Sequence, residues 1–327
     1  MVGIFKQKTP VNSLLLLIYA LILKFPEFLR PSPPLQQQED HYLYTLLMKF
    51  LLPLEIPDLL YTITAFLILF LQATLLNRIF SELKMLPKPN FLAGMSFILL
   101  TSLFTEWNHF SAPLLINGLL IFMFYRIVNL YNNASPSKGI FNIGLMMGIV
   151  SLLYQPAILF VIMIPFSLFI MRPFRIREWL IGFLGVTTPY YFFVLEPLIT
   201  NKWTWSHLVP SIPIDFPAMP SSIFITLSIV LLALPFIIGG YYVQSNLNKM
   251  LIQIRKGWSV LLLFLIIASI IILVNGGVNY VNWVFCIMPI SAFHAAAYYY
   301  PNKPRLPSIL HWIIFAYALY LGYWATA

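Results

Sequence analysis

The residues best suited to chemistry lie just after the first apolar segment of the chain. Arg30 ends that segment, and the neighbouring carboxylates Glu39 and Asp40 follow about ten residues later, directly before the tyrosine-containing stretch 42–52. Adjacent carboxylates can act as a general base or hold a divalent cation, and an arginine can bind a phosphate group. The simpler alternative, which the spacing alone favours, is that Glu39 and Asp40 start a helix over 41–52 through the helix dipole.

A second group of polar residues, 105–109, lies in a short connection between two later apolar segments. Glu106 and His109 are its members with acid–base chemistry, and they could also supply one metal ligand each. An ordinary polar turn is the commoner explanation of such a group. The five histidines show no HxxxH or HxxE spacing. Because a non-haem iron site needs several converging histidines, the sequence disfavours an iron oxygenase.

The elements that must position these residues are membrane-spanning helices. The 327 residues are 60% apolar and 9% charged, with a mean hydropathy of +0.86, whereas a soluble domain carries about 25% charged residues. This composition excludes an ordinary cytosolic enzyme, a disordered chain and a fibrous one. It predicts an all-α polytopic transmembrane helical bundle of about 11 spans at about 20 residues each. The chain 1–327 is then a single integral membrane domain with no soluble domain.

The apolar segments define the expected spans and two long outer connections. Lys24, Phe25 and Pro26 stand where a signal peptide would carry its cleavage site, so we expect the first span to remain uncleaved. The outer loop 30–56 is expected to contain an interfacial amphipathic helix. The second long outer loop, 200–220, is rich in Trp and Pro, which also fits an interfacial aromatic belt. The expected spans are 12–29, 57–76, 91–107, 111–130, 140–154, 156–171, 178–199, 221–243, 257–274, 281–299 and 308–325.

The charges predict how the bundle is oriented. The net charge is +9, and fifteen of the nineteen basic residues fall on one side if the N-terminus is cytoplasmic. This agrees with the positive-inside rule, so we expect a cytoplasmic N-terminus, an outer C-terminus and no nucleic-acid partner. If 140–171 were a single span, all later connections would change sides and the bias of the basic residues would be lost. Eight of the ten acidic residues fall at or near the outer side, where solubility of that surface is the alternative explanation.

Short motifs give the chain a resemblance to a known class of enzymes. The arginine, the proline-containing loop and the acidic pair followed by tyrosine resemble the first outer loop of the GT-C class of membrane glycosyltransferases. The Gly-rich segment 139–148, the Gln155-Pro156 turn and the basic residues 172–175 are similar to elements that recur in this order in that class. The resemblance covers about residues 12–195. The class usually has Asp-Glu or a lone Asp where this chain has Glu-Asp, and no acceptor-binding motif can be named.

The resemblance implies a function and a set of site residues. It implies a membrane glycosyltransferase, or an inactive relative, that uses a polyprenyl-phosphate sugar at the outer face of the bacterial inner membrane. The N-terminus, residues 3–6, is also similar to a family of bacterial inner-membrane proteins without an established activity. The expected catalytic residues are Asp40, Glu39, Glu106 and His109, and the expected phosphate-binding residues are Arg30, Lys49 and Lys202.

Two points stay open in this expectation. The cofactor is unknown, with a divalent cation as the candidate that the acidic residues favour. The alternative function is that of a non-catalytic membrane subunit of an envelope assembly, or of a lipid-handling transporter. In either case membrane lipids are expected partners, and the second case adds an envelope protein.

Overall fold

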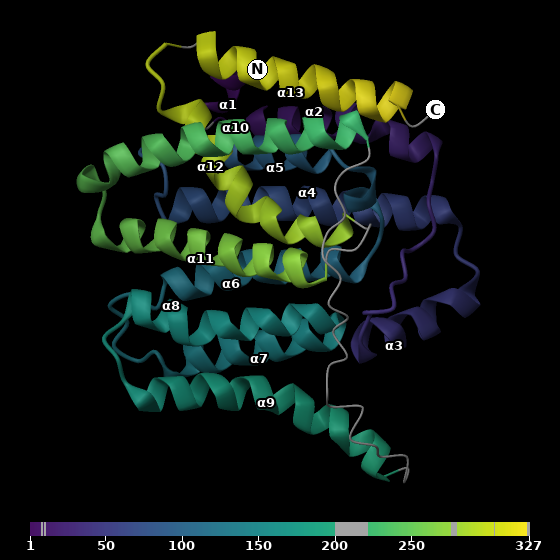
Figure 1. Ribbon diagram of the computed structural model, residues 1–327, viewed down its shortest axis with the longest axis vertical. Helices are drawn as coiled ribbons and strands as arrows, with labels where there is room; N and C mark the ends of the chain where they lie inside the picture. Colours follow the sequence, from purple (N-terminus) through teal and green to yellow (C-terminus); the bar gives the residue numbers. More distant parts are fainter. Residues whose placement is uncertain (8, 10, 200–221, 276–279, 304, 326–327) are drawn as a thin grey trace.

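The computed structural model describes residues 1–327 except 8, 10, 200–221, 276–279, 304 and 326–327. This part of the chain is helical, with one isolated β-bridge between Asp40 and Tyr154 and no strand. Helices of similar direction lie side by side, and their connections gather at two opposite ends (Figure 1). The α-helices are α1 (Val2–Phe5), α2 (Val11–Leu29), α3 (Tyr42–Leu51), α4 (Asp58–Glu82), α5 (Leu92–Thr101), α6 (Ala112–Val128), α7 (Ser137–Leu153), α8 (Met163–Met171), α9 (Ile176–Ile199), α10 (Ile223–Asn246), α11 (Ile252–Val274), α12 (Ile287–Tyr299) and α13 (Arg305–Tyr320). Shorter turns are η1 (Leu52–Leu54), η2 (Thr105–Asn108), η3 (Gln155–Ile162), η5 (Leu247–Lys249), η6 (Val281–Cys286) and η7 (Leu321–Ala325).

The expected helical segments are present, and the structure supports a membrane protein. Seven of them are long and apolar enough to cross a membrane: Val11–Leu29, Asp58–Glu82, Ile176–Ile199, Ile223–Lys249, Ile252–Val274, Val281–Tyr299 and Arg305–Trp324. The segments expected at 91–107, 111–130, 140–154 and 156–171 are helices of ten to seventeen residues. The figure of about 11 spans therefore stays a prediction for these four shorter helices.

Two helices form the centre of the bundle, and others cover them. All ten residues of α5 are buried, and the span that contains α12 is 89% buried. The spans of α9, α10 and α13 are only 22–28% buried. Because a lipid-facing surface needs no polar side chains, apolar residues remain exposed along these outer helices.

The α5 helix is shorter than the span expected at 91–107. At 1.5 Å per residue its ten residues extend about 15 Å, which is about half of a hydrocarbon core. The hydroxyls of Thr101 and Ser102 turn back to donate to the carbonyl of Ile98, and the chain then becomes extended at Phe104. The segment 102–111 is therefore irregular backbone between helices, which is tolerated at membrane depth only where protein surrounds it.

The segment 140–171 is divided as the charge pattern predicts. Tyr154 has an extended backbone between the end of α7 and the start of η3. The η3 turn and α8 then pack back against α7 and α9. Pro156 near the start of η3 lacks an amide hydrogen and has a fixed φ, which suits it to a turn between two helices.

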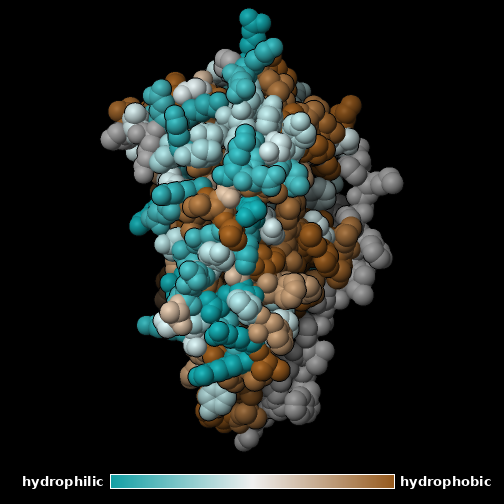
Figure 2. Space-filling model, turned by 90° about the vertical axis from the view of Figure 1, so that its left-hand side faces the viewer, coloured by the Kyte–Doolittle hydropathy of each residue, from teal (hydrophilic) through white to brown (hydrophobic). Residues whose placement is uncertain are grey.

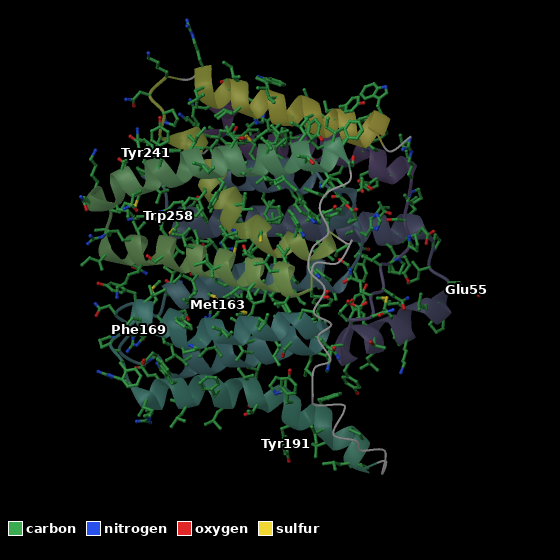
Figure 3. All side chains as sticks on the ribbon, viewed as in Figure 1. Glu55, Met163, Phe169, Tyr191, Tyr241 and Trp258 are labelled. Carbon is green, nitrogen blue, oxygen red and sulfur yellow. The ribbon has the colours of Figure 1, made fainter. Side chains whose placement is uncertain are left out.

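The two ends of the bundle differ in character. The connections α4–α5, α6–α7, α8–α9, α10–α11 and α12–α13 lie at one end, on the left of Figure 1. Viewed from that side, hydrophilic residues gather in a band with hydrophobic residues beside it (Figure 2). Glu55 and Phe169 mark the two ends in Figure 3, with Glu55 near the end of α3 on the right. Most of the basic residues expected on the cytoplasmic side lie in the left-hand connections or near the ends of the helices that these connections join.

Glycines allow neighbouring helices to approach closely. A side chain at Gly144 would clash with the carbonyl of Gly182, and one at Gly185 would clash with the carbonyl of Phe141. These residues lie on α7 and α9, the most extensively packed pair of helices. Gly239 on α10 lies equally close to the carbonyl of Phe293 on α12. Small residues at helix contacts are typical of membrane bundles.

We predict that Gly239→Ala destabilises the protein by about 1–3 kcal/mol, the usual cost of overpacking a tight contact. The added methyl group would push α10 away from the Phe293 backbone. Gly240→Ala is the matched control, because no heavy atom lies within 4 Å of a methyl group there. Thermal unfolding in detergent measures both variants. Equal melting temperatures for the two variants would contradict the close contact.

Candidate functional site

The acidic pair is held against the turn between α7 and η3. The amide of His41 donates to the carbonyl of Leu153 at 3.1 Å, and the amide of Gln155 donates to the carbonyl of Glu39 at 3.0 Å. These two hydrogen bonds form the isolated bridge that pairs Asp40 with Tyr154. A loop residue with paired backbone on both sides has a defined position, as a catalytic group requires.

The carboxyl group of Asp40 does not start α3. The N-cap of α3 is His41, and no side chain caps this helix. Asp40 Oδ2 instead accepts a hydrogen bond from the amide of Gln37, three residues earlier, at 2.7 Å. Asp40 Oδ1 is buried and has no hydrogen-bond partner. Asp40 therefore does not cap α3 with its side chain, and one of its buried oxygens has no hydrogen-bond partner.

The environment of Asp40 changes its acidity. Burial raises the pKa of Asp40 to about 7, the amide of Gln37 opposes the shift, and the negative charge of Glu39 adds to it. A carboxyl group with a pKa near 7 exchanges protons readily at neutral pH, which suits a general base or acid. Burial also lowers the pKa of the adjacent His41, so this imidazole is neutral at pH 7.

Two tyrosines lie near the acidic pair: Tyr44, from the stretch that follows it, and Tyr154, whose position no motif predicted. The Tyr154 side chain is fully buried, and its hydroxyl oxygen accepts a hydrogen bond from Asn275 Nδ2 at 3.1 Å. Tyr44 donates to the carbonyl of Leu35 at 2.8 Å and lies near the carbonyl of Phe110. The amide of Leu35 also donates to the Phe110 carbonyl, at 2.8 Å. The outer loop is thus attached to the segment 102–111.

A second polar group, which we call the recessed cluster, consists of Lys24, Glu27, Glu106 and Asn108. Lys24 is only 3% exposed, and its ammonium group donates to Asn108 Oδ1. Asn108 Nδ2 donates in turn to Glu27 Oε1 at 2.9 Å. Glu106 acts electrostatically on Glu27. One amide therefore joins a buried cation to a carboxylate.

The recessed cluster lies beside the first three turns of α4. Lys24, Glu27 and Asn108 line a small cavity with Thr62 and Leu69, about one to three helical turns from the start of α4. A larger cavity of about 200 Å³ borders the cluster and is also lined by residues of α10, including Phe224, and by Tyr280. The early end of α5 leaves the room that the cluster occupies.

The four expected catalytic residues form two groups. Glu39 and Asp40 lie at the bridge to Tyr154, whereas Glu106 lies in the recessed cluster and acts on His109. Burial lowers the pKa of His109, and the Glu106 charge opposes this shift. In the described part of the chain, no hydrogen bond or ion pair given by the structure joins the two groups. Lys24 and Glu27 were not expected in a site, although a lysine near the end of an apolar helix is itself a signal of function.

Three cations were expected to bind phosphate, and the structure describes two of them. Arg30 is exposed and acts electrostatically on Glu27. Lys49 is exposed in the last turn of α3. Lys202 lies outside the described residues. Over the same part of the chain, no three His, Cys, Asp or Glu side chains are placed so that they could hold a metal ion.

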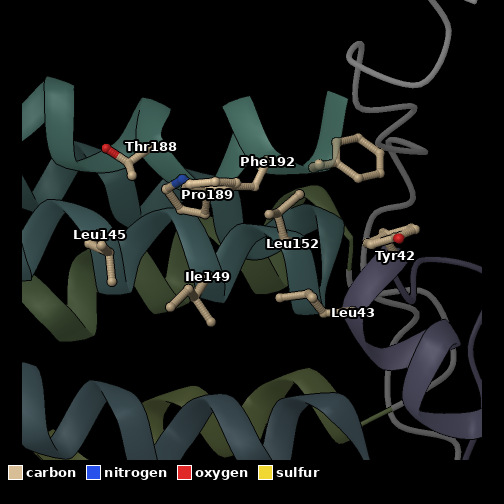
Figure 4. Close-up of a pocket in the computed structure, with 9 residues that line it drawn as sticks. Tyr42, Leu43, Leu145, Ile149, Leu152, Thr188, Pro189 and Phe192 are labelled. Carbon is tan, nitrogen blue, oxygen red and sulfur yellow. The ribbon is translucent and has the colours of Figure 1, made fainter. Parts of the chain in front are cut away.

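An apolar groove begins at Tyr42 and Leu43, in the first turn of α3 (Figure 4). Its volume is about 440 Å³, and it lies between α3, α7 and α9. Phe193 lies at its α3 end, with its ring 4.7 Å from that of Tyr42 and 5.6 Å from that of His41. The groove therefore ends next to the residues that follow Asp40. Its other lining residues are Leu43, Leu145, Ile149, Leu152, Thr188, Pro189 and Phe192.

We predict that Asp40→Asn gains stability relative to the wild type as the pH rises. The folded pKa of about 7 exceeds the ordinary value of 3.8, so the unfolded chain ionises first. The wild type is then destabilised progressively between about pH 4 and pH 7, and asparagine does not ionise. Melting temperatures across this range measure the effect, with exposed Glu55→Gln as the control. A constant difference between Asp40→Asn and wild type would contradict a raised pKa.

We predict that Asn108→Ala destabilises the protein by about 1–3 kcal/mol or more, because Lys24 and Glu27 both lose a hydrogen-bond partner. Exposed Asn129→Ala, which removes a hydrogen bond to Tyr125 at 2.9 Å, is the control and should change stability much less. Chemical unfolding in detergent compares them. Similar losses in the two variants would show that the recessed cluster adds nothing.

Comparisons with known proteins do not place this chain in a family. No family model, no curated protein and no solved structure matches it. Nothing in these comparisons bears on the resemblance to GT-C glycosyltransferases, which therefore rests on the short motifs of the chain.

Proposed function

We propose that this protein is a membrane glycosyltransferase that takes its sugar from a lipid-phosphate carrier at the outer face of the bacterial inner membrane. The observation that carries the proposal is the position of Asp40. One of its buried oxygens has no hydrogen-bond partner, its pKa is raised to about 7, and it stands two residues before Tyr42, which lines an apolar groove. A lipid-linked donor has the same two parts, a hydrocarbon chain and a polar reacting group.

The groove suits the carrier chain. Its lining is almost entirely aliphatic and aromatic, and it is formed by α7 and α9, which lie at one edge of the bundle in Figure 1. The span of α9 is only 28% buried inside the protein. A hydrocarbon chain could therefore enter from the surrounding lipid without crossing a polar surface, and burial of its methylene groups would favour binding.

Asp40 would act as the general base. Its Oδ1 would accept the proton of the acceptor hydroxyl while the hydroxyl oxygen forms a bond to the anomeric carbon of the sugar. The bond from that carbon to the carrier phosphate oxygen breaks, and the phosphate leaves with the electron pair. The backbone bridge to Tyr154 holds the base in place during the transfer.

One observation favours a second candidate, a lipid-handling membrane component without transferase activity. Among the described residues, no ion pair given by the structure joins Lys49 to Glu39 or Asp40, where it could neutralise a leaving phosphate. The groove would then hold a lipid for transport or for assembly of an envelope complex. This candidate predicts that Asp40 is replaceable.

We predict that Asp40→Asn reduces sugar transfer at least about 100-fold, the usual contribution of a general base. A strain lacking the gene is complemented with wild type, Asp40→Asn or Glu55→Gln, and its lipid-linked sugars and surface glycans are measured by mass spectrometry. Glu55→Gln removes an exposed charge from the same end of the bundle and should restore the wild-type profile. The transfer rate of the wild type should also rise as the pH increases through about 7, because the base must be ionised.

Two results would refute the proposal. A wild-type glycan profile in the strain that carries Asp40→Asn would show that Asp40 is not the general base. An unchanged profile in the deletion strain, together with loss of a co-purifying complex, would favour the second candidate.

A further inference from the structure

A basic pocket lies at the end of the bundle opposite to the acidic pair. It has a volume of about 500 Å³ and lies between the α6–α7 connection, the α8–α9 connection and the first turns of α11. Three cations line it, Arg172, Arg175 and Lys256. Its polar lining also includes Asn132 and Asn133 from the α6–α7 connection. The three cations come from two separate segments of the chain, so the pocket depends on the folded structure.

Arg172 builds the pocket and is itself neutralised. Its side chain is largely buried, and Nε and Nη2 donate to the two carboxylate oxygens of Glu178 at 2.9 and 3.2 Å. Nη1 donates to the carbonyls of Leu130 and Asn133, both at 2.8 Å. One guanidinium group thus joins the α6–α7 and α8–α9 connections. A bidentate pair of this kind is both strong and directional.

The other two cations, Arg175 and Lys256, keep hydrogen-bond donors that a ligand can use. Arg175 is 67% exposed, and its nearest carboxylate oxygen, on Glu178, is 4.0 Å away and already bound to Arg172. Lys256 donates to the carbonyl of Met171 at 3.2 Å and lies 5.0 Å over the ring of Tyr131. An ammonium group has three donors, so two remain. The pocket therefore carries about two uncompensated positive charges.

Exposed apolar residues neighbour the pocket-lining residues in the chain. Phe174 and Ile176, next to Arg175, are 61% and 67% exposed, and the ring of Phe174 packs edge-on against that of Trp179 at 5.0 Å. Phe169, in the last turn of α8, is 69% exposed at the same end of the bundle (Figure 3). Exposed aromatic rings beside basic residues are typical of a membrane interface. The pocket thus opens where lipid headgroups would lie.

We propose that this pocket binds a phosphate group through Arg175 and Lys256. The guanidinium offers a planar pair of donors and the ammonium a point charge, the combination with which proteins bind phosphates. The neighbouring apolar residues favour the headgroup of an anionic lipid as the source of the phosphate. A soluble phosphate compound has the same chemistry and is the second source to be tested. This site is independent of Asp40 and of the proposed transferase activity.

The test compares two double variants of the full-length protein. Arg175→Gln/Lys256→Gln removes both pocket charges and leaves the Arg172–Glu178 pair intact. Arg177→Gln/Arg255→Gln removes the same charge from exposed positions that immediately neighbour these segments but do not line the pocket. Each protein is reconstituted in nanodiscs of phosphatidylcholine with phosphatidic acid, and the lipids it retains are counted by native mass spectrometry. Melting temperatures with and without glycerol 3-phosphate test the soluble source.

If the phosphate is presented by a lipid, the wild type and Arg177→Gln/Arg255→Gln retain phosphatidic acid in preference to phosphatidylcholine. Arg175→Gln/Lys256→Gln should lose about thirtyfold in that preference, about fivefold for each basic residue. If the source is soluble, glycerol 3-phosphate instead raises the melting temperature of the wild type and of the control variant, but not of the pocket variant. Equal losses in both double variants, or no binding of either probe by the wild type, would overturn the proposal.

Discussion

Two backbone hydrogen bonds, on either side of the Asp40–Tyr154 bridge, connect distant segments at one end of this bundle. They attach the loop after α2 to the turn after α7, and these segments are more than a hundred residues apart in the chain. The same turn divides the region 140–171 into two helical segments. Tyr154 therefore both sets the path of the chain and fixes the position of the acidic residue. The bridge therefore holds Asp40 against the turn after α7, two residues before Tyr42 at the groove.

The groove in turn depends on small residues. Gly144 and Gly185 bring the backbones of α7 and α9 together, and the larger residues Ile149 and Phe192 lie along the opening beyond this contact. The helices α7 and α9 are close together at the glycines, and larger side chains line the groove further along them. Gly144, from the Gly-rich segment 139–148, thus has a packing role that does not depend on whether the protein is an enzyme or a transporter.

The sequence predicted the helices well because the signal is local. A run of apolar residues in a chain with few charges leaves helix as the main structure that satisfies its backbone. The amphipathic stretch after Asp40 is found as α3, and the turn at Gln155-Pro156 is found as a break between two helices. The early end of α5 at Thr101 was not predicted, because Leu103 and Phe104 continue the apolar segment beyond it.

The contacts within the site were harder to predict, because they join distant segments. Lys24 and Asn108 are 84 residues apart, and neither carries a local motif that names its partner. The sequence placed Glu106 with the acidic pair because both belong to outer connections. The structure places it beside Glu27, since the irregular segment after α5 folds inward rather than along the surface.

The separation of the two acidic groups narrows the choice of a proton acceptor. Glu27 already accepts a hydrogen bond from Asn108, which also binds the ammonium group of Lys24. One oxygen of Glu27 is therefore already bound within the recessed cluster. Among the carboxylates that the structure describes, Asp40 has the buried oxygen without a partner, and burial raises its pKa toward neutrality. A ligand that brings a hydroxyl group to this oxygen would satisfy it and would be deprotonated by the same contact.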